Sequence, residues 1–220
     1  EHFDCDVRRG SIPDVKWYET WKKHYVPRAI GDHFEVRPPW AEAPVAAGRW
    51  PIRIEPRNAF GTGYHETTRL MIVALEATPL AGKTYLDAGC GSAILSIAAL
   101  RLGARKILGF DIDKESIENA QENLRVNDDA GDVTRVELRC AVPADVMGSY
   151  DVVGANIIAN VLYEIRDDLV RLARPGGTLL ICGLLEGDQD ETRQHFEAVG
   201  LQTVEQLHEN GWYLLRMLKP

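Results

Sequence analysis

The chain has 220 residues, of which 45% are hydrophobic and 26% charged, a composition typical of globular proteins. Its length suits one domain with a short appendage and allows a sizeable core without disulfides. The longest apolar stretch, around residues 93–100, is too short to span a bilayer, and the acidic start lacks the layout of a signal peptide. We therefore expect a cytoplasmic protein with no membrane partner.

The four cysteines and the net charge narrow the classes of partner. The cysteines lie far apart, and no histidine lies at metal-ligand spacing from them, which indicates reduced thiols and no zinc site. Residues 1–60 carry ten Lys and Arg against nine Asp and Glu, whereas residues 61–220 carry fifteen against twenty-four. An acidic main body disfavours direct binding of nucleic acid and is compatible with a basic partner, although solubility alone would also explain it.

The first 57 residues differ in composition from the rest, with four of the five tryptophans. Residues 14–25 predict a short helix whose aromatic stripe we interpret as a docking face onto the main body rather than a ligand site. Residues 34–37 and 52–55 alternate like short strands between prolines. We expect residues 1–57 to form a linker region and residues 58–220 the main domain.

From about residue 64 the pattern alternates between helices and strands. Helices are predicted at residues 65–77, 93–102, 114–126, 158–173 and 188–199, and strands at residues 84–86, 106–110, 134–139, 150–155, 178–182, 202–208 and 212–217. Near-continuous apolar strands are typical of a parallel sheet covered by helices on both faces. Glu209-Asn210-Gly211 predicts a closing hairpin, so one strand at the edge is antiparallel. We therefore expect an α/β fold with a mostly parallel seven-stranded sheet and ligands beyond the carboxyl ends of its strands.

The first strand of the main domain ends in a glycine loop, Leu86-Asp87-Ala88-Gly89-Cys90-Gly91-Ser92-Ala93. Gly89 and Gly91 allow a sharp turn and a close approach of backbone to ligand. The dinucleotide fingerprint requires a third glycine where this chain has Ile94, and the carboxylate of Asp87 would repel a pyrophosphate. The loop therefore favours a cationic cofactor without phosphate, such as S-adenosylmethionine, over a nicotinamide dinucleotide.

A second carboxylate, Asp111, ends the next strand, twenty-two positions after Gly89. A carboxylate at that strand end can accept hydrogen bonds from both ribose hydroxyls. Asp113 is instead expected to cap the helix that begins at residue 114.

Several further motifs resemble one family. They are Phe60-Gly61-Thr62-Gly63-Tyr64-His65-Glu66-Thr67-Thr68, the loop at residues 87–95, Gly109-Phe110-Asp111-Ile112-Asp113, Ala155-Asn156-Ile157-Ile158, Gly183-Leu184-Leu185 and Gly211-Trp212. In this order and spacing, over about residues 17–218, the chain resembles the PrmA family, methyltransferases of protein eleven of the large ribosomal subunit. The resemblance implies a Rossmann-like class I methyltransferase fold. It also implies S-adenosylmethionine-dependent N-methylation of lysine or other amino groups of a ribosomal protein, with S-adenosylhomocysteine as the product.

The resemblance implies roles for individual residues. Residues 61–63 would form a mobile lid over the methionine end of the cofactor, and Thr68 would hydrogen-bond the cofactor unless it caps the following helix. Phe60 would shield the sulfonium by a cation–π contact or merely pack the lid. Ile112 would sandwich the adenine with Ala141. The implied cofactor-binding residues are Phe60, Gly63, Thr68, Asp87, Gly89, Gly91, Asp111, Ile112 and Asn156, and no metal is expected.

Asn156 is the candidate catalytic residue. It ends a strand inside an apolar stretch, where an amide must find partners, so it is either a helix cap or a binding group. The resemblance favours binding, in which its oxygen would accept a hydrogen bond from the incoming amine and aim the nitrogen lone pair at the methyl carbon. No His, Asp or Glu stands out as a base, so solvent would accept the proton.

Three features differ from the family pattern. Ala93 stands where glycine is usual, which would lower the affinity for the cofactor, and Cys182 stands where serine is usual. The resemblance also implies a separate N-terminal recognition domain, of which residues before Trp17 would hold only the tail and its linker, so efficient action of this chain on the ribosomal protein is left open. We expect a monomer. The alternatives are a class I methyltransferase with another protein or small-molecule acceptor, a non-catalytic S-adenosylmethionine-binding module, and a nicotinamide-dependent oxidoreductase, which the glycine loop disfavours.

Overall fold

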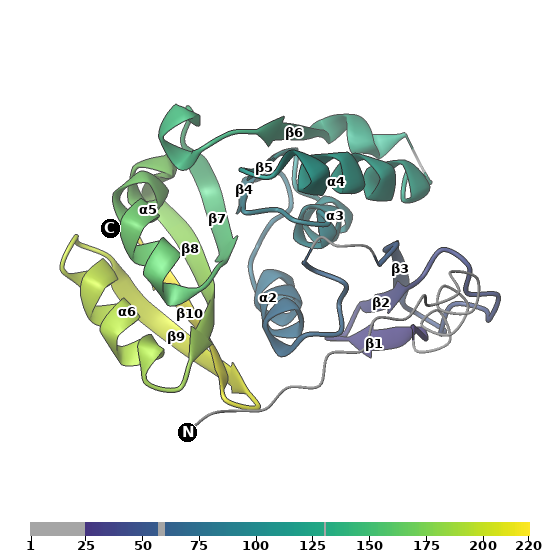
Figure 1. Cartoon of the computed structure of the whole chain (residues 1–220), viewed down its shortest axis with the longest axis horizontal. Helices are drawn as coiled ribbons and strands as arrows, with labels where there is room; N and C mark the ends of the chain where they lie inside the picture. Colours follow the sequence, from purple (N-terminus) through teal and green to yellow (C-terminus); the bar gives the residue numbers. More distant parts are fainter. Residues whose placement is uncertain (1–24, 57–59, 130) are drawn as a thin grey trace, which may run out of the picture.

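The computed structural model describes residues 25–56, 60–129 and 131–220, so the helix predicted for residues 14–25 lies, except for Tyr25, outside the described residues. Two sheets form in this part of the chain (Figure 1). The small sheet has the order β1-β2-β3, with β1 (Arg28–Ile30), β2 (Phe34–Arg37) and β3 (Trp50–Arg53). The large sheet has the order β6-β5-β4-β7-β8-β10-β9, with β4 (Thr84–Ala88), β5 (Lys106–Asp111), β6 (Val136–Cys140), β7 (Tyr150–Asn156), β8 (Ala173–Leu185), β9 (Gln202–Glu209) and β10 (Trp212–Leu218).

The large sheet confirms the predicted class. Its strands from β6 to β8 are parallel. The antiparallel strand expected at the edge is β10, and it lies one strand in from the edge, between β8 and the outermost strand β9. Asn210 and Gly211 join β9 to β10 with φ angles of 48° and 81°. Positive φ at both positions matches the twist of a two-residue hairpin, which explains why an Asn-Gly pair closes the sheet.

Helices cover both faces of the large sheet (Figure 1). Those on one face are α2 (Glu66–Glu76), α3 (Ile94–Arg101) and α4 (Lys114–Val126), and those on the other are α5 (Ala159–Leu172) and α6 (Asp188–Glu197). Two short 3-10 helices, η1 (Asp132–Arg135) and η2 (Pro143–Asp145), flank β6. Among the described residues, no helix is both long and apolar enough to cross a membrane.

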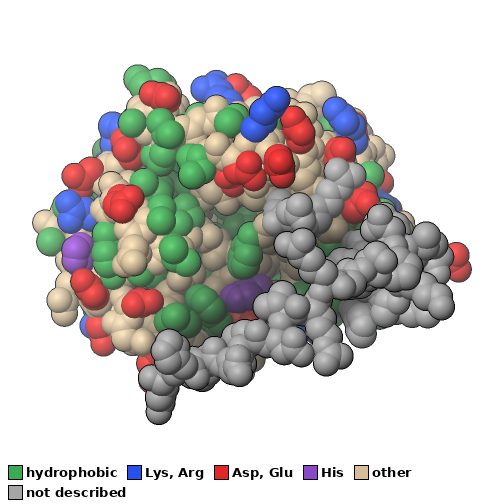
Figure 2. All heavy atoms as spheres, in the orientation of Figure 1, with side chains coloured by type: hydrophobic (Ala, Val, Ile, Leu, Met, Phe, Trp, Pro, Cys, Tyr) green, Lys and Arg blue, Asp and Glu red, His purple; other side chains and the backbone are tan. Residues whose placement is uncertain are grey.

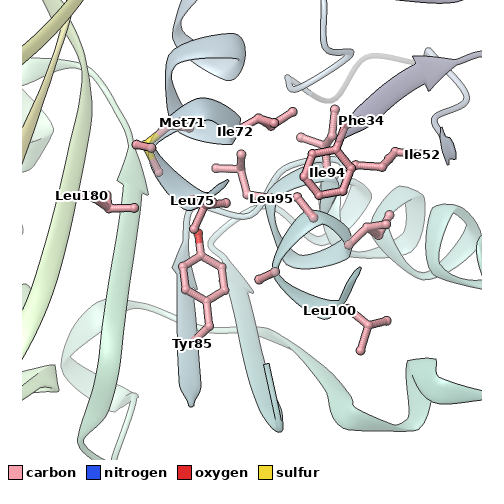
Figure 3. Close-up of a cluster of buried hydrophobic side chains, with 14 of the residues drawn as sticks. Phe34, Ile52, Met71, Ile72, Leu75, Tyr85, Ile94, Leu95, Leu100 and Leu180 are labelled. Carbon is pink, nitrogen blue, oxygen red and sulfur yellow. The ribbon is translucent and has the colours of Figure 1, made fainter. Parts of the chain in front are cut away.

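The small sheet shares the core beneath α2 and α3. Phe34 of β2 and Ile52 of β3 are completely buried in the same cluster as Met71 and Ile94. Figure 3 shows these side chains converging from the small sheet, α2 and α3, with Tyr85 of β4 below them. Each such side chain contributes about 1.5–3 kcal/mol through burial. Residues on both sides of the predicted boundary at residue 57 therefore pack in one continuous core.

Two local predictions need correction. β3 spans Trp50–Arg53 rather than residues 52–55, because Pro51 is accommodated in a strand that pairs on one side with β2. The sequence analysis also missed β1, which has only three residues and whose first two are exposed. A strand this short carries too little alternation to be recognised.

The capping residues of two helices bear on the site. The carboxylate of Asp113 accepts hydrogen bonds at 3.1 Å from the backbone N–H groups of Glu115 and Ser116, which confirms it as the N-cap of α4. The N-cap of α2 is His65, whose Nδ1 accepts a hydrogen bond from the Thr67 N–H at 3.3 Å. Thr68 is therefore not needed as a cap.

Candidate functional site

A cavity of about 730 Å³ opens at the carboxyl ends of β4, β5 and β7, where the strand order reverses. Its position agrees with the expectation for ligand sites in open parallel sheets. Figure 2 shows the hollow on this face, with hydrophobic side chains gathered along the side of α5. The lining residues are Phe60, Gly61, Thr68, Gly89, Cys90, Gly91, Ile94, Leu95, Phe110, Asp111, Ile112, Ser116, Val142, Pro143, Asn156, Ile157, Val161, Glu164 and Ile165.

The glycine loop forms the floor of the cavity. Gly89 and Gly91 have φ angles of 68° and 51°, a region that L side chains rarely adopt. A Cβ atom at position 91 would lie 2.7 Å from the carbonyl oxygen of Phe60, so only glycine allows this approach. The Gly91 N–H donates to Oδ2 of Asp111 at 3.0 Å, and the Asp113 N–H donates to Oδ1 at the same distance. Each carboxylate oxygen of Asp111 thus accepts one hydrogen bond that orients it, and Asp111 also lines the cavity.

Ser92 of the glycine loop connects that loop to residues 60 and 61 by hydrogen bonds. The Ser92 N–H donates to the Phe60 carbonyl at 3.0 Å, and its hydroxyl donates to the Gly61 carbonyl at 2.7 Å. The Phe60 ring is 54% exposed and contacts the His65 ring edge-on at 5.3 Å between centroids. Gly63 has a φ of 83° and is buried next to Val36, outside the cavity lining.

Thr68 and Asn156 contribute polar side chains to the cavity lining. Thr68 is completely buried, and within the described part of the chain its Oγ1 is unpaired. Asn156 ends β7, and the N-cap of α5 is Ile158, so the amide does not cap that helix. A buried hydroxyl left unpaired costs about 1–3 kcal/mol. Both side chains are thus available to a ligand.

Asp87, like Gly63, is a predicted cofactor-binding residue that lies outside the cavity lining. It is 1% exposed, lies beneath the loop and is absent from the cavity lining. Its Oδ2 accepts a hydrogen bond from the Ser96 hydroxyl at 2.6 Å, while Oδ1 has no partner among the described residues. Burial raises the pKa of Asp87 to about 7. Binding of the cofactor by Asp87 stays a prediction. Direct contact would require a movement of the glycine loop that lies between Asp87 and the cavity.

The opposite wall of the cavity is apolar and open. Ile112 is 71% exposed and Val142 is 48% exposed. Ala141, expected beside the adenine, packs against the core instead, and Val142 takes its place in the lining. The sequence analysis missed Val161 and Ile165 because they are ordinary apolar residues of a helix, and only its packing beside η2 brings them to the cavity.

The chemistry of the donor set fits S-adenosylmethionine. The carboxylate of Asp111 suits a ribose diol, the apolar wall suits an adenine, and the unpaired Thr68 hydroxyl suits the polar methionine end. The Cys90 thiol also lines the cavity, but burial raises its pKa, so it stays protonated and is a poor nucleophile. Among the described residues, no cluster of three or more His, Cys, Asp or Glu could hold a metal ion.

The sheet order, the glycine loop after its first strand and the carboxylate at the end of the next define the Rossmann-like methyltransferase fold. Within that class, the sequence profile described as "Ribosomal protein L11 methyltransferase (PrmA)" matches residues 2–220, and the chain belongs to this family.

Individual relatives agree with this assignment. The chain is 35% identical over 210 residues to a Clostridium botulinum (strain Eklund 17B / Type B) protein named ribosomal protein L11 methyltransferase, covering 95% of this chain and 64% of that protein. A protein of the same name from Streptococcus pneumoniae serotype 4 is 34% identical over 217 residues, covering 95% and 66%. The crystal structure of ribosomal protein L11 methylase from Lactobacillus delbrueckii subsp. bulgaricus matches with a TM-score of 0.80 and 28% identity, covering 89% of this chain and 99% of that chain. This chain spans about two thirds of the length of the two sequence relatives.

Proposed function

We propose that this chain contains the catalytic domain of an S-adenosylmethionine-dependent N-methyltransferase that modifies amino groups of ribosomal protein L11. Membership of the family supports the reaction class, and the relatives' names support the substrate. The observation that carries the proposal is the Asn156 amide at the end of β7, which does not cap α5 and lines the same cavity as the glycine loop and Asp111. The cytoplasmic location and the monomeric state expected from the sequence are part of the proposal.

The cofactor would be held along the cavity by the glycine loop and by the Asp111 and Thr68 side chains, with its adenine against Ile112 and Val142. When bound, S-adenosylmethionine supplies a methyl group activated on a sulfonium. Phe60, at the mouth of the cavity, would shield that end from water.

Asn156 would orient the acceptor. A lysine amine in water has a pKa of about 10.4, so well under 1% is neutral at pH 7. The apolar cavity wall lowers that pKa by desolvation, and the Asn156 oxygen accepts a hydrogen bond from the neutral amine, which aims its lone pair. No ionised base is required if solvent takes the proton.

The test begins with calorimetric titration of the chain with S-adenosylmethionine and, separately, with NAD. Binding of the first alone supports the class, whereas binding of NAD alone rejects it. Methyl transfer to L11 is then compared for wild type and Asn156→Ala, using the chain alone and a form extended by the N-terminal recognition domain that the family resemblance implies. We expect Asn156→Ala to keep the cofactor Kd within about threefold and to lose roughly 10²-fold in kcat, as for a lost orienting group. A variant as fast as wild type would reject the role of Asn156.

A further inference from the structure

Two asparagines lie four positions apart at the end of α4: Asn123 is in its last turn, and Asn127 is its C-cap residue. Both are completely buried. Each side-chain amide binds the backbone at the end of β3 or just after it. The Asn123 Oδ1 accepts a hydrogen bond from the Glu55 N–H at 3.0 Å, and the Asn127 Oδ1 accepts one from the Arg53 N–H at 2.8 Å. The two amides thus continue the hydrogen bonding of a short strand whose other edge pairs with β2.

The Nδ2 atoms of the two side-chain amides donate hydrogen bonds to different segments of the chain. The Asn127 Nδ2 donates to the carbonyls of Arg53 and Asn123, both at 2.7 Å, so it stays within α4 and the segment it holds. The Asn123 Nδ2 donates to the carbonyl of Ser92 at 3.0 Å, in the glycine loop. Of these two asparagines, only Asn123 therefore joins the segment after β3 to the glycine loop.

Ser92 extends this connection to residues 60 and 61. It is 1% exposed and lies outside the cavity lining, yet its N–H binds the Phe60 carbonyl and its hydroxyl binds the Gly61 carbonyl. The contact is tight, because a Cβ atom on Gly61 would lie 2.7 Å from the Ser92 Oγ. Asn123 therefore binds Ser92, and Ser92 in turn binds residues 60 and 61.

We propose that Asn123 is a positioning residue of the cofactor site: by binding both Glu55 and Ser92, it fixes the glycine loop and residues 60–63, which include the lid expected at residues 61–63, in the geometry that closes over the methionine end. This inference rests on the proposed function for the identity of the ligand. The physical reason is preorganisation. A loop already held in its bound geometry loses less conformational freedom when the ligand binds. Without the Asn123 amide, the Ser92 carbonyl loses its hydrogen-bond donor. The glycine loop and the segment at residue 55 can then separate from α4.

The test compares Asn123→Ala with Asn127→Ala as its control. Asn123→Ala loses one hydrogen bond to Glu55 and the contact with Ser92, whereas Asn127→Ala loses two hydrogen bonds to Arg53 and leaves the contact with Ser92 in place. Ser92→Ala, which removes only the hydroxyl bonds of Ser92, is the second variant if Asn123→Ala folds poorly. Melting temperatures establish that the pair is matched in stability. Titrations with S-adenosylmethionine and with adenosine, which lacks the methionine end, are then compared.

We expect Asn123→Ala and Ser92→Ala to weaken binding of S-adenosylmethionine about tenfold while changing adenosine binding less than threefold, as for loss of a preorganised lid. Asn127→Ala should leave both affinities unchanged. Equal losses for Asn123→Ala and Asn127→Ala, or equal losses for both ligands, would overturn the inference.

Hydrogen exchange separates this inference from the proposed function. In the protein without ligand, peptides covering residues 60–63 and 89–93 should exchange faster in Asn123→Ala than in wild type and Asn127→Ala. Unchanged exchange overturns the positioning role even if wild type binds S-adenosylmethionine. Faster exchange in Asn123→Ala alone supports that role even if wild type binds no S-adenosylmethionine, a result that would reject the proposed function.

Discussion

The two walls of the cavity are built on different principles. On one side, residues 60–68 and the glycine loop are held by backbone and hydroxyl hydrogen bonds centred on Ser92. On the other, Ile112 and Val142 expose about half or more of their surface and make the cavity apolar. The first wall is thus held by hydrogen bonds within the protein, whereas the apolar side chains of the second wall stay exposed. Substitutions in the first wall should therefore change stability and affinity together, and substitutions in the second should change affinity alone.

The largest effect is expected from Gly91→Ala in the hydrogen-bonded wall. The new Cβ must displace the Phe60 carbonyl, 2.7 Å away, in addition to the strain of a φ of 51°. We expect a destabilisation of about 2–4 kcal/mol and loss of measurable S-adenosylmethionine binding. Urea unfolding and calorimetry measure both. Gly82→Ala is the control, because Gly82 has a φ of 72° but no atom within 4 Å of its Cβ. Equal losses in both variants would show that backbone strain alone, and not the contact with residue 60, sets the effect.

The next effect is a pH dependence caused by Asp87 beneath the same wall. Its folded-state pKa, raised to about 7 chiefly by burial, exceeds the value near 3.9 of an unfolded aspartate. The native state therefore binds a proton that the unfolded state lacks between about pH 4 and pH 7. Wild-type stability should fall by up to about 1.4 kcal/mol per pH unit across that window.

Asp87→Asn removes this titration, since an amide stays neutral and still accepts the Ser96 hydrogen bond. Its free energy of unfolding relative to wild type should rise between pH 5 and pH 8, as measured by urea unfolding at each pH. Asp113→Asn is the control, because hydrogen bonds at the start of α4 lower the pKa of that exposed carboxyl and the variant should show no such gain. A parallel pH profile for Asp87→Asn and wild type would contradict the prediction.

Ile112→Ala should separate affinity from stability in the open wall. Since the side chain is 71% exposed, its truncation should change the free energy of unfolding by no more than about 0.5 kcal/mol. The lost apolar contact should weaken S-adenosylmethionine binding about tenfold. Met147→Ala, at a position 72% exposed but outside the cavity lining, should change neither. If Ile112→Ala lowered stability as much as affinity, the distinction between the two walls would not hold.

The smallest effect is expected at Ala93, where the first wall enters α3. Ala93 is buried with a φ of 64°, a conformation that costs an L residue about 1–2 kcal/mol. Glycine relieves this strain but loses a buried methyl group and gains freedom in the unfolded chain, which offsets about 0.4–1 kcal/mol or more. Ala93→Gly should therefore shift stability by less than about 1 kcal/mol and raise cofactor affinity at most threefold. Asn210→Gly, at the other non-glycine position of positive φ among the described residues, should leave affinity unchanged. A large gain in affinity for Ala93→Gly alone would show that the methyl group obstructs the site.

Much of the site could be predicted because its residues follow strand ends. Gly89, Asp111 and Asn156 lie at the carboxyl ends of three parallel strands, and parallel strands bring those ends to one edge. The helix-cap assignment of Asp113 also needed only local sequence. The cavity wall contributed by α5 could not be predicted in this way, because no local pattern distinguishes Val161 or Ile165 from ordinary core residues.

The sequence by itself determined the order of helices and strands, the parallel class of the sheet and the glycine loop, since apolar periodicity, capping and turn chemistry are local properties. Only the tertiary structure decided that Asp87 is sealed beneath the loop, that the Thr68 hydroxyl is unpaired and that Asn123 reaches Ser92. Burial and hydrogen-bond pairing depend on which distant segments pack together. Residues 92 and 123 are 31 positions apart, one in the glycine loop and one in α4, and the local sequence pattern around either residue contains no information about that contact.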